Sequence, residues 1–530
     1  MTRSLGPLLA TFATRLFIFI ALAAINRFCG PVVSAQSLPS PSARIDIVAT
    51  SANILLPGVA PPIGSASKMN WLAPDAADQS LTVSVPIHEF SVTDFEIRFS
   101  VSADTEIKVD FLGPWQQDDD GSLQELTVHW NAANIVGGKL IGFKPGTAWH
   151  NRRINATFSA KANQPFVLRC SATVPETLRD RSTPRPSGDS AAFQLANQFR
   201  RGANLGNFLE VPPGEDWGDN SMKENDYRIM KEHGFDHVRI PIGWHHYCGP
   251  APDYMISQNI IRKVNQQLDY AQQAGLAAIV NVHHFDAFTS DPTGQHDKLL
   301  KIWSQIATLM KDRPTSVAFE ILNEPKDSAT TDVMNGFYAD VVPMIRTIDA
   351  KKAIFVGPGQ FNQTSELSRL KLPSDDRLIV SIHSYTPHYF THQGAPWSEE
   401  CRRLRGIPFP GPPAKSVAIP PGIANYVDEW LQRFNQLPAD QNPGGYAAIT
   451  SELKLAADWG KYWNRPIHLG EFGTYMKASP KDRSEYYRFV SSEATRLGIG
   501  WCIWDWKAGF AYWDRTRNDA HPGMRAALFP

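Results

Sequence analysis

The chain has 530 residues, of which 42% are hydrophobic and 20% charged, so its composition is that of a globular protein long enough for two domains. Its 52 basic and 53 acidic side chains nearly cancel, which leaves no basic field for a nucleic acid or an anionic membrane. We therefore expect neither of these as a partner. We also expect a monomer.

Residues 1–35 have the pattern of an export signal. Two arginines precede the apolar stretch 16–25, and small residues at 33–35 fit a cleavage site. The stretch is short for a bilayer span, although Arg27 behind it leaves an uncleaved anchor as the alternative. Cleavage would remove three arginines and no acid, leaving 49 basic and 53 acidic side chains and a net charge of −4. We predict a secreted or periplasmic protein with no membrane part in its mature form.

Residues 36–174 favour an all-β antiparallel sandwich. Short alternating runs follow one another without intervening helices, at Leu81–Val85, Phe95–Val101, Thr105–Phe111, Glu125–Trp130, Arg153–Ser159 and Pro165–Ser171. The tryptophans of this region could stack on sugar rings, as in a carbohydrate-binding module, or pack within the sandwich. They are Trp71, Trp115, Trp130 and Trp149. A proline-rich linker is predicted at 175–190.

Residues 191–530 alternate between strand and helix patterns. Eight strands are predicted, at Arg201–Leu205, Asp236–Pro241, Ala277–Val282, Ser316–Leu322, Ala353–Val356, Arg377–Ile382, Pro466–Gly470 and Gly500–Trp504. Helices are predicted between them, at Lys223–His233, Ser257–Ala274, Gln295–Lys311, Asp332–Asp349, Ala447–Trp463 and Pro480–Leu497. This α/β pattern favours a (β/α)8 TIM barrel over a doubly wound sheet. The proline-rich excursion 390–446 interrupts the alternation, and a loop of that length is typical of a lid or a cleft wall.

Polar residues gather where these strands end. They are Arg239, His283, His284, Asn323, Glu324, His383, Tyr385, Glu471 and Trp504. The carboxyl ends of barrel strands face one cleft, so these residues are expected to converge. Two of them, Glu324 before Pro325 and Glu471, are carboxylates at strand ends, which suggests paired acid/base chemistry.

Metal and cofactor motifs are missing from the chain. The sequence has neither a glycine-rich phosphate loop nor an HExxH zinc motif. The histidine pairs at 245–246 and 283–284 are adjacent in sequence, and adjacent strand residues point to opposite faces. They would therefore make poor joint ligands. We expect no metal and no cofactor.

The stretch from about residue 200 to the end resembles glycoside hydrolase family 5, the cellulase-type members of the retaining-glycosidase barrel clan. The resemblance is carried by ordered motifs, which are RGANLGN at 201–207, VRIP at 238–241, NVHH at 281–284, LNEP at 322–325, HSY at 383–385 and LGEFG at 469–473. It implies double displacement with retention at the anomeric carbon. The leading expectation is an exported endo-β-1,4-glucanase acting on a β-glucan polysaccharide or oligosaccharide.

Other functions remain open on the same motifs. A mannanase, a xyloglucanase or a β-1,3-glucanase would share the catalytic set, because substrate choice depends on the loops. A non-catalytic glycan-binding protein that keeps the fold is an alternative of a different class. So is a transglycosylase that acts in making the cell's own glucan.

The resemblance also implies roles for single residues. Glu324 matches the general acid/base and Glu471 the nucleophile, with Arg239 and Tyr385 at the positions that hydrogen-bond the nucleophile. Asn323 matches the residue that holds the sugar 2-hydroxyl. His283 and His383 match histidines that line the cleft, His284 lies beside them as a second candidate, and Trp504 matches the platform under the reacting sugar. Glu324 is expected to stay protonated at rest, and Glu471 to stay ionised.

The remaining cysteines and tryptophans are assigned less directly. Four cysteines follow the predicted cleavage site, namely Cys170, Cys248, Cys401 and Cys502. Cys248 and Cys401 fall in predicted loops on one barrel face and are the favoured disulfide pair. Outer tryptophans of the barrel, Trp244 and Trp397, could line further sugar subsites or pack. Three others are predicted to pack, namely Trp501, Trp506 and Trp513.

Overall fold

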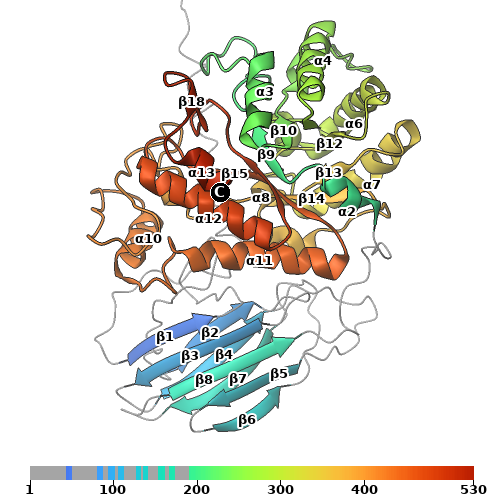
Figure 1. Ribbon diagram of the computed structural model, residues 1–530. Helices are drawn as coiled ribbons and strands as arrows, with labels where there is room; N and C mark the ends of the chain where they lie inside the picture. The colour runs from blue at the N-terminus through green and yellow to red at the C-terminus, as the bar shows by residue number, and fades with distance from the viewer. Residues whose placement is uncertain are drawn as a thin grey trace, which may run out of the picture.

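The computed structural model describes residues 190–530, together with eight strands between residues 43 and 173. These eight strands form two sheets, with the orders β1-β3-β8-β5-β6 and β2-β4-β7 (Figure 1). Their bounds are β1 (Ala43–Ala49), β2 (Ser80–Pro86), β3 (Thr93–Val101), β4 (Thr105–Leu112), β5 (Thr127–Ala132), β6 (Ile135–Leu140), β7 (Arg153–Ala160) and β8 (Phe166–Thr173). Strands β1 and β6 were not predicted.

Pairing within these sheets is antiparallel with one exception, since β2 and β4 run parallel. The expectation of a purely antiparallel arrangement is therefore wrong at that pair. The predicted export signal and linker lie outside the described residues, and so do the side chains of the four N-terminal tryptophans. The sandwich and its binding of carbohydrate stay predictions.

Eight parallel strands close into a barrel and follow one another around it in sequence order. They are β9 (Arg201–Asn204), β10 (His237–Ile240), β11 (Ala277–Asn281), β12 (Val317–Glu320), β13 (Ile354–Val356), β14 (Leu378–His383), β15 (Ile467–Phe472) and β16 (Gly500–Ile503). All residues of β10 to β16 are buried, as expected of parallel strands covered on both faces. The predicted (β/α)8 barrel is confirmed, and the doubly wound alternative is wrong.

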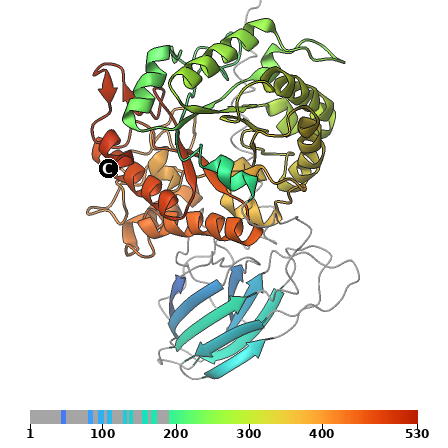
Figure 2. The same cartoon turned by 45° about the vertical axis from the view of Figure 1, so that its right-hand side comes forward.

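Helices surround the barrel (Figure 2). The longer ones are α3 (Glu224–His233), α4 (Gln258–Gln273), α6 (Pro292–Met310), α7 (Thr331–Ile348), α10 (Asn425–Gln436), α11 (Tyr446–Trp463) and α12 (Pro480–Arg496). Short elements complete the chain, namely α2 (Ala191–Ala196), η3 (Trp244–Tyr247), α5 (Asp286–Ser290), α8 (Gly359–Asn362), η4 (Thr364–Arg369), α9 (His388–Thr391), β17 (Trp513–Asp514), β18 (Asp519–Ala520) and α13 (Met524–Leu528). Among the described residues, no helix combines the length and the apolar character that a bilayer span needs.

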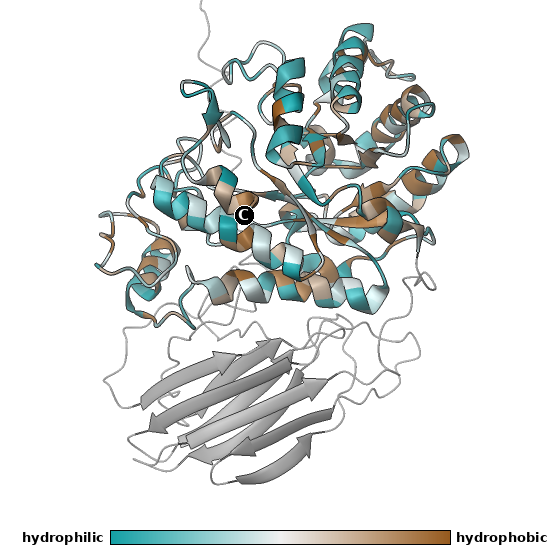
Figure 3. Cartoon of the chain, viewed as in Figure 1, coloured by the Kyte–Doolittle hydropathy of each residue, from teal (hydrophilic) through white to brown (hydrophobic). Residues whose placement is uncertain are grey.

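Helix α4 shows how the sequence sets these elements. Ser257 precedes the helix, and its hydroxyl accepts a hydrogen bond from the backbone N–H of Asn259, which caps the first turn. The helix gives way to Gly275, whose φ of +70° suits glycine. Its buried residues recur at helical spacing, at Ile260, Ile261, Val264, Gln267, Leu268 and Ala271. Figure 3 shows the same mixture of hydrophilic and hydrophobic residues on the helices around the barrel.

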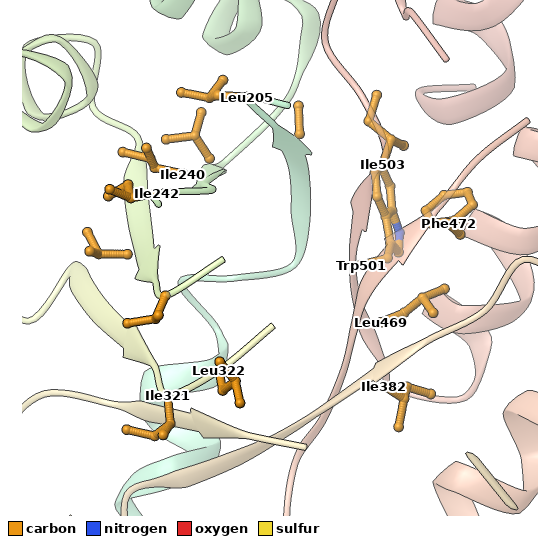
Figure 4. Packing of buried hydrophobic residues seen from close by; sticks show 14 of the residues in the cluster. Leu205, Ile240, Ile242, Ile321, Leu322, Ile382, Leu469, Phe472, Trp501 and Ile503 are labelled. Atoms are coloured by element: carbon orange, nitrogen blue, oxygen red, sulfur yellow. The ribbon is translucent and has the colours of Figure 1, made fainter. Parts of the chain in front are cut away.

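Two apolar clusters support the barrel. The larger one includes residues of β9, β10, β12, β14, β15 and β16 or of the segments that follow them, ten of which are labelled in Figure 4. The smaller cluster comprises Phe199, Ala277, Ile279, Ala318, Ala353, Phe355 and Ile379, with Leu195 and Ala196 of α2 packed against it. Because Ala277, Ala353 and Ile379 lie at or near the starts of their strands, this smaller cluster closes the amino end of the barrel. Two buried histidines, His237 and His468, pack against its Phe199 and Phe355 rings.

The proline-rich excursion 390–446 is a packed segment with helix α10 inside it. It buries its own apolar residues, which include Phe390, Cys401, Leu404, Ile407, Phe409, Leu431 and Phe434. The ring of Phe409 packs edge-on against Tyr486 of α12, with 5.4 Å between the ring centroids. This segment therefore belongs to the hydrophobic core on the α12 side of the barrel.

The favoured disulfide between Cys248 and Cys401 is wrong, because both cysteines are free. Cys401 is fully buried within the core of the 390–446 segment. Cys248 follows η3, and its thiol donates a hydrogen bond to the backbone oxygen of Trp244. Loops that open on one face of a barrel need not meet, and sequence spacing carries no information on that point. Cys502 on β16 is also a free, buried thiol.

Candidate active site

Arg239 on β10 is the fully buried centre of the polar cluster at the carboxyl end of the barrel. Its guanidinium donates to both carboxylate oxygens of Glu320, at 2.6 and 2.9 Å. It also donates to Glu471 at 2.8 Å, to Asn204 at 2.8 Å and to Asn323 at 2.7 Å. These hydrogen bonds engage all five N–H groups of the guanidinium. The neighbouring carboxylates, Glu320 foremost, raise the pKa of Arg239 against the effect of burial, so the cation is permanent.

Glu471 lies near the end of β15 and is held through both of its carboxylate oxygens. Oε1 accepts the hydrogen bond from Arg239, and Oε2 accepts one from the Tyr385 hydroxyl at 2.8 Å. Burial and the negative charge of Glu471 raise the pKa of Tyr385 well above its usual value, so its hydroxyl keeps the proton that it donates. The carboxylate is thus fixed in orientation by a charged donor and a neutral one.

Glu324 follows β12 in a loop, and its side chain is 21% exposed. The φ angle of Glu324 is +45°, in the left-handed region. The sequence predicts only that Pro325 ends the strand and gives no sign of this conformation. A non-glycine residue in this region stores strain, which is typical of functional positions. His383 Nδ1 lies 2.9 Å from Glu324 Oε1 and 3.8 Å from Glu471 Oε1, so this histidine touches one glutamate and neighbours the other.

His383 itself depends on a glycine. A Cβ at residue 470 would lie 2.9 Å from His383 Nε2 and 2.6 Å from Ser381 Oγ. Any side chain at this position would therefore displace the imidazole from Glu324. Gly470, one residue before Glu471, therefore allows His383 to stay in contact with Glu324.

The two glutamates differ in what sets their ionisation. Burial is the largest influence on Glu471 and raises its pKa, against the lowering effects of His383, Arg239 and Tyr385. Burial also raises the pKa of Glu324, but the hydrogen bond and charge of His383, with smaller contributions from His284 and Arg239, lower it overall. This order is the reverse of the expectation that Glu324 holds the proton at rest. The reason is the His383 contact, because the hydrogen bond and the charge of this side chain favour the ionised form of Glu324.

His283 and Trp504 lie face to face, with 5.7 Å between ring centroids and 4° between their planes. His283 is buried, and burial lowers its pKa well below the usual value, so it is neutral. Trp504 is half-buried and fits closely above Gly206, where a Cβ would lie 2.9 Å from the indole. His284 is exposed, has a φ of +50°, and packs its ring against that of Trp217 at 6.5 Å.

The outer tryptophans separate into two kinds. Trp244 is fully buried, and its indole N–H donates to the backbone oxygen of Asn281, so its prediction as a possible sugar subsite is wrong. Trp397 is 49% exposed and packs edge-on against Tyr475 at 4.9 Å. The remaining three, Trp501, Trp506 and Trp513, are buried packing residues.

Sequence reasoning missed two buried members of this cluster, Asn204 and Glu320, both of which accept hydrogen bonds from Arg239. Asn204 is fully buried on β9, accepts from Arg239, and donates through Nδ2 to the backbone oxygens of Gly470 and Ile503. Glu320 ends β12 within an otherwise apolar run. The sequence contained a sign that Glu320 is paired, because a carboxylate in a buried strand requires a charged partner. The sequence could not name that partner.

Glu324, His383 and Glu471 each offer one metal-ligand atom, and the three atoms lie within 4.8 Å of one another. Among the described residues these are the side chains that could hold a metal ion. The Arg239 cation lies 2.8 Å from Glu471 Oε1 and opposes a second positive charge there. The geometry suits a pair of reacting carboxyl groups better than a metal centre.

Residues 197–509 match the family described as Cellulase, glycosyl hydrolase family 5. A curated relative, Endoglucanase H of Acetivibrio thermocellus, is 27% identical over 356 residues, which cover 67% of this chain and 35% of the relative. Cellulase/esterase CelE of the same organism is 28% identical over 60% of this chain and 36% of its own length. The chain thus spans about a third of the length of these two relatives.

Solved structures give the same result. The fold matches Thermotoga maritima Cel5A, described in complex with cellobiose, with a TM-score of 0.55 and 31% identity over 64% of this chain and 100% of that one. It also matches the cellulose synthase subunit Z of Clostridioides difficile, with a TM-score of 0.55 and 27% identity over 63% of this chain and 100% of that one. Both matches are to chains that the barrel covers completely. The protein belongs to glycosyl hydrolase family 5.

Proposed function

We propose that the protein is an exported endo-β-1,4-glucanase that hydrolyses β-glucan by a retaining double displacement. The observation that carries this proposal is the pairing of Glu324 and Glu471, which offer oxygen atoms within 4.8 Å of each other. Retaining glycosidases place their carboxyl groups about 5–5.5 Å apart, whereas inverting enzymes leave about 6.5–9.5 Å for a water molecule. The similarity to named endoglucanases supports the choice of β-glucan as substrate.

In the first step, Glu471 attacks the anomeric carbon and forms a glycosyl-enzyme ester. Glu324 gives its proton to the departing glycosidic oxygen, so the leaving sugar departs as a neutral alcohol. In the second step Glu324 takes a proton from water, whose oxygen attacks the anomeric carbon and releases Glu471. Two inversions give net retention.

The surrounding residues fit these steps. Arg239 and Tyr385 hold the Glu471 carboxylate by its two oxygens and stabilise it when it leaves the sugar. Asn323 is held through Oδ1 by Arg239, and its buried Nδ2 has no hydrogen-bond partner among the described residues. That N–H pair is available for a sugar hydroxyl. The hydrogen bond between His383 and Glu324 holds the acid/base carboxyl in place.

Two lines of aromatic rings support a substrate longer than a disaccharide. One leads from Trp504 through His283 and His284 to Trp217, which is 37% exposed. The other leads from Tyr385 through Phe510 to the exposed Trp397. Exposed aromatic faces suit the C–H faces of sugar rings, and several of them in line are expected of an enzyme that cuts within a chain.

The proposal is tested with purified protein on carboxymethyl cellulose, glucomannan, xyloglucan and laminarin. We expect the highest turnover on carboxymethyl cellulose, with viscosity falling faster than reducing ends appear, and β-anomers as the first products in an NMR time course. Glu471→Gln should lower kcat/KM by about 10⁴-fold or more, because it removes the nucleophile. Glu485→Gln, which alters a glutamate on α12 paired with Arg488, is the matched control. Absence of turnover on all four polymers would refute the glucanase, and wild-type activity of Glu471→Gln would refute the nucleophile.

A second candidate function has support from two of the comparisons. One solved structure similar to this chain is a subunit of a cellulose synthase, which favours a hydrolase or transglycosylase that acts while glucan is being made. Thermotoga maritima Cel5A is also described in complex with mannotriose, which favours mannan chains as further substrates. Turnover of glucomannan above that of carboxymethyl cellulose, or transfer of cellobiosyl groups to added sugars in place of hydrolysis, would favour these alternatives.

We also propose that residues 36–174 form a separate sandwich that binds insoluble glucan after export. Deleting the residues before Asp189 should leave activity on soluble polymer and lower retention on insoluble cellulose. Unchanged retention would assign the region a structural role. Cell fractionation combined with N-terminal sequencing of the mature protein tests the export signal.

A further inference from the structure

Glu320 ends strand β12 and is buried, with 2% of its side chain exposed. It forms a two-point ion pair with Arg239, in which Nε–H donates to one carboxylate oxygen at 2.6 Å and Nη2–H to the other at 2.9 Å. Strand β11 separates β10 from β12, so this pair crosses the barrel interior. None of the roles assigned above uses Glu320.

The two-point contact fixes the plane of the guanidinium. The remaining N–H groups of Arg239 are aimed at Glu471, Asn323 and Asn204, which come from β15, the loop after β12, and β9. A planar, rigid fork cannot turn about one contact without losing the others. The direction in which Arg239 presents its hydrogen bond to Glu471 is therefore set by Glu320.

Glu320 also changes how much positive charge Glu471 experiences. Arg239 is one cation with two buried carboxylates as partners, at 2.6 Å and 2.8 Å. Burial raises the pKa of Glu471 despite Arg239, which agrees with a cation whose charge is divided between two anions. A carboxylate held by an undivided guanidinium charge would be a weaker nucleophile, because its ionised form would be more strongly stabilised.

We propose that Glu320 is a positioning residue, which orients the Arg239 guanidinium toward Glu471 and Asn323 and takes up part of its charge so that Glu471 remains reactive. This role depends on the proposed glycosidase function. Glu320 acts through Arg239 and has no contact of its own with Glu471 or with Glu324 among the hydrogen bonds and ion pairs of the described residues.

Two variants separate charge from orientation. Glu320→Gln removes the negative charge and leaves Arg239 to Glu471 alone, so the acid limb of the kcat/KM profile should move down by about one pH unit. Its kcat should fall about 10- to 100-fold through the lost alignment. Glu320→Asp keeps the charge but is one methylene too short for both contacts. It should lose kcat similarly while its acid limb stays near the wild-type position.

Asp375→Asn is the matched control, because Asp375 forms a comparable two-point ion pair with Arg346 at 2.6 and 3.1 Å. Asp375 lies before β14, at the opposite end of the barrel from the catalytic cluster. This variant should lower the thermal midpoint without changing the acid limb or kcat. Equal pH profiles in wild type and Glu320→Gln would overturn the charge role, and wild-type kcat in Glu320→Asp would overturn the orienting role.

The test of positioning remains decisive if Glu320→Gln does not fold. Glu320→Asp then carries the test, since a folded protein with a tenfold lower kcat and an unchanged KM supports positioning, whereas wild-type kcat overturns it. Failure of the proposed glycosidase function can be told apart from failure of the Glu320 proposal. In the first case the wild-type protein would show no turnover on any of the four polymers. An active wild type with unaltered variants overturns the role of Glu320 alone.

Discussion

The two ends of the barrel interior are built from the same strands but differ in chemistry. At the amino end, Ile279, Ala318 and Phe355 form an apolar layer that α2 closes. At the carboxyl end, Arg239 and Glu320 form an ion pair surrounded by polar groups. The contrast separates two requirements of one fold. The apolar layer at the amino end stabilises the fold through burial. The polar cluster at the carboxyl end holds the reacting groups in place, although burying charges is unfavourable.

The largest expected effect concerns the acid/base at the carboxyl end. Glu324→Gln should lower kcat/KM on polysaccharide by about 10²- to 10⁴-fold, because the leaving oxygen no longer receives a proton. Initial rates on carboxymethyl cellulose and on an aryl cellobioside with an acidic phenol would check this. The loss should be smaller on the aryl substrate, whose leaving group needs no proton. An equal loss on both would contradict the role of acid.

A substitution at the amino end of the barrel should lower the stability of the protein and leave its catalytic rate unchanged. Phe355 is fully buried and packs edge-on against Phe199 at 5.3 Å, so Phe355→Ala should lower the free energy of unfolding by about 3–5 kcal/mol. Denaturant unfolding measures this loss, and kcat measured well below the thermal midpoint should stay within about twofold of wild type. If kcat fell with little change in stability, the two ends would not be independent.

The hydroxyl of Tyr385 is expected to affect rate and pH together. Tyr385→Phe removes a hydrogen bond to a charged group, worth about 1.5–3 kcal/mol, which corresponds to roughly a 10- to 100-fold loss in kcat/KM. The hydroxyl lowers the pKa of Glu471, so its removal raises that pKa. Because Glu471 acts in the ionised form, the acid limb of kcat/KM should move to higher pH. A shift to lower pH would contradict this assignment and would resemble the result expected for Glu320→Gln.

The smallest effect is expected at the margin of the site. Trp397→Ala should raise KM on carboxymethyl cellulose by about 2- to 10-fold, the equivalent of one aromatic contact of 0.5–1.5 kcal/mol. An aryl cellobioside too short to reach Trp397 should be hydrolysed as before. Val333→Ala, at another exposed apolar residue, controls for loss of surface area. An equal rise in KM on carboxymethyl cellulose and on the aryl cellobioside would show that Trp397 supports the fold and binds no sugar.

Much of the barrel follows from local sequence. The eight strands and six of the seven longer helices were predicted within a few residues, because short buried runs alternate with amphipathic segments bounded by caps and glycines. Helix α10 was missed, because it lies inside the proline-rich excursion 390–446. The convergence of Arg239, Asn323, Glu324 and Glu471 also follows, since strand ends of a parallel barrel open on one face. Strands β1 and β6 were missed. Strand β6 contains Gly137 and Gly138, which weaken a strand pattern, and β1 is not preceded by a clear turn signal.

Other features of the site depend on distances across the barrel that no local pattern records. Sequence alone identified the two glutamates and predicted that they act as a pair. Only the tertiary structure showed that His383 touches Glu324, that Trp244 is buried, and that Cys248 and Cys401 remain apart as free thiols. It also showed that Arg239 divides its charge between Glu320 and Glu471. The physical reason is that ionisation depends on burial and on neighbours from other strands, whereas strand and helix formation depends on neighbours along the chain.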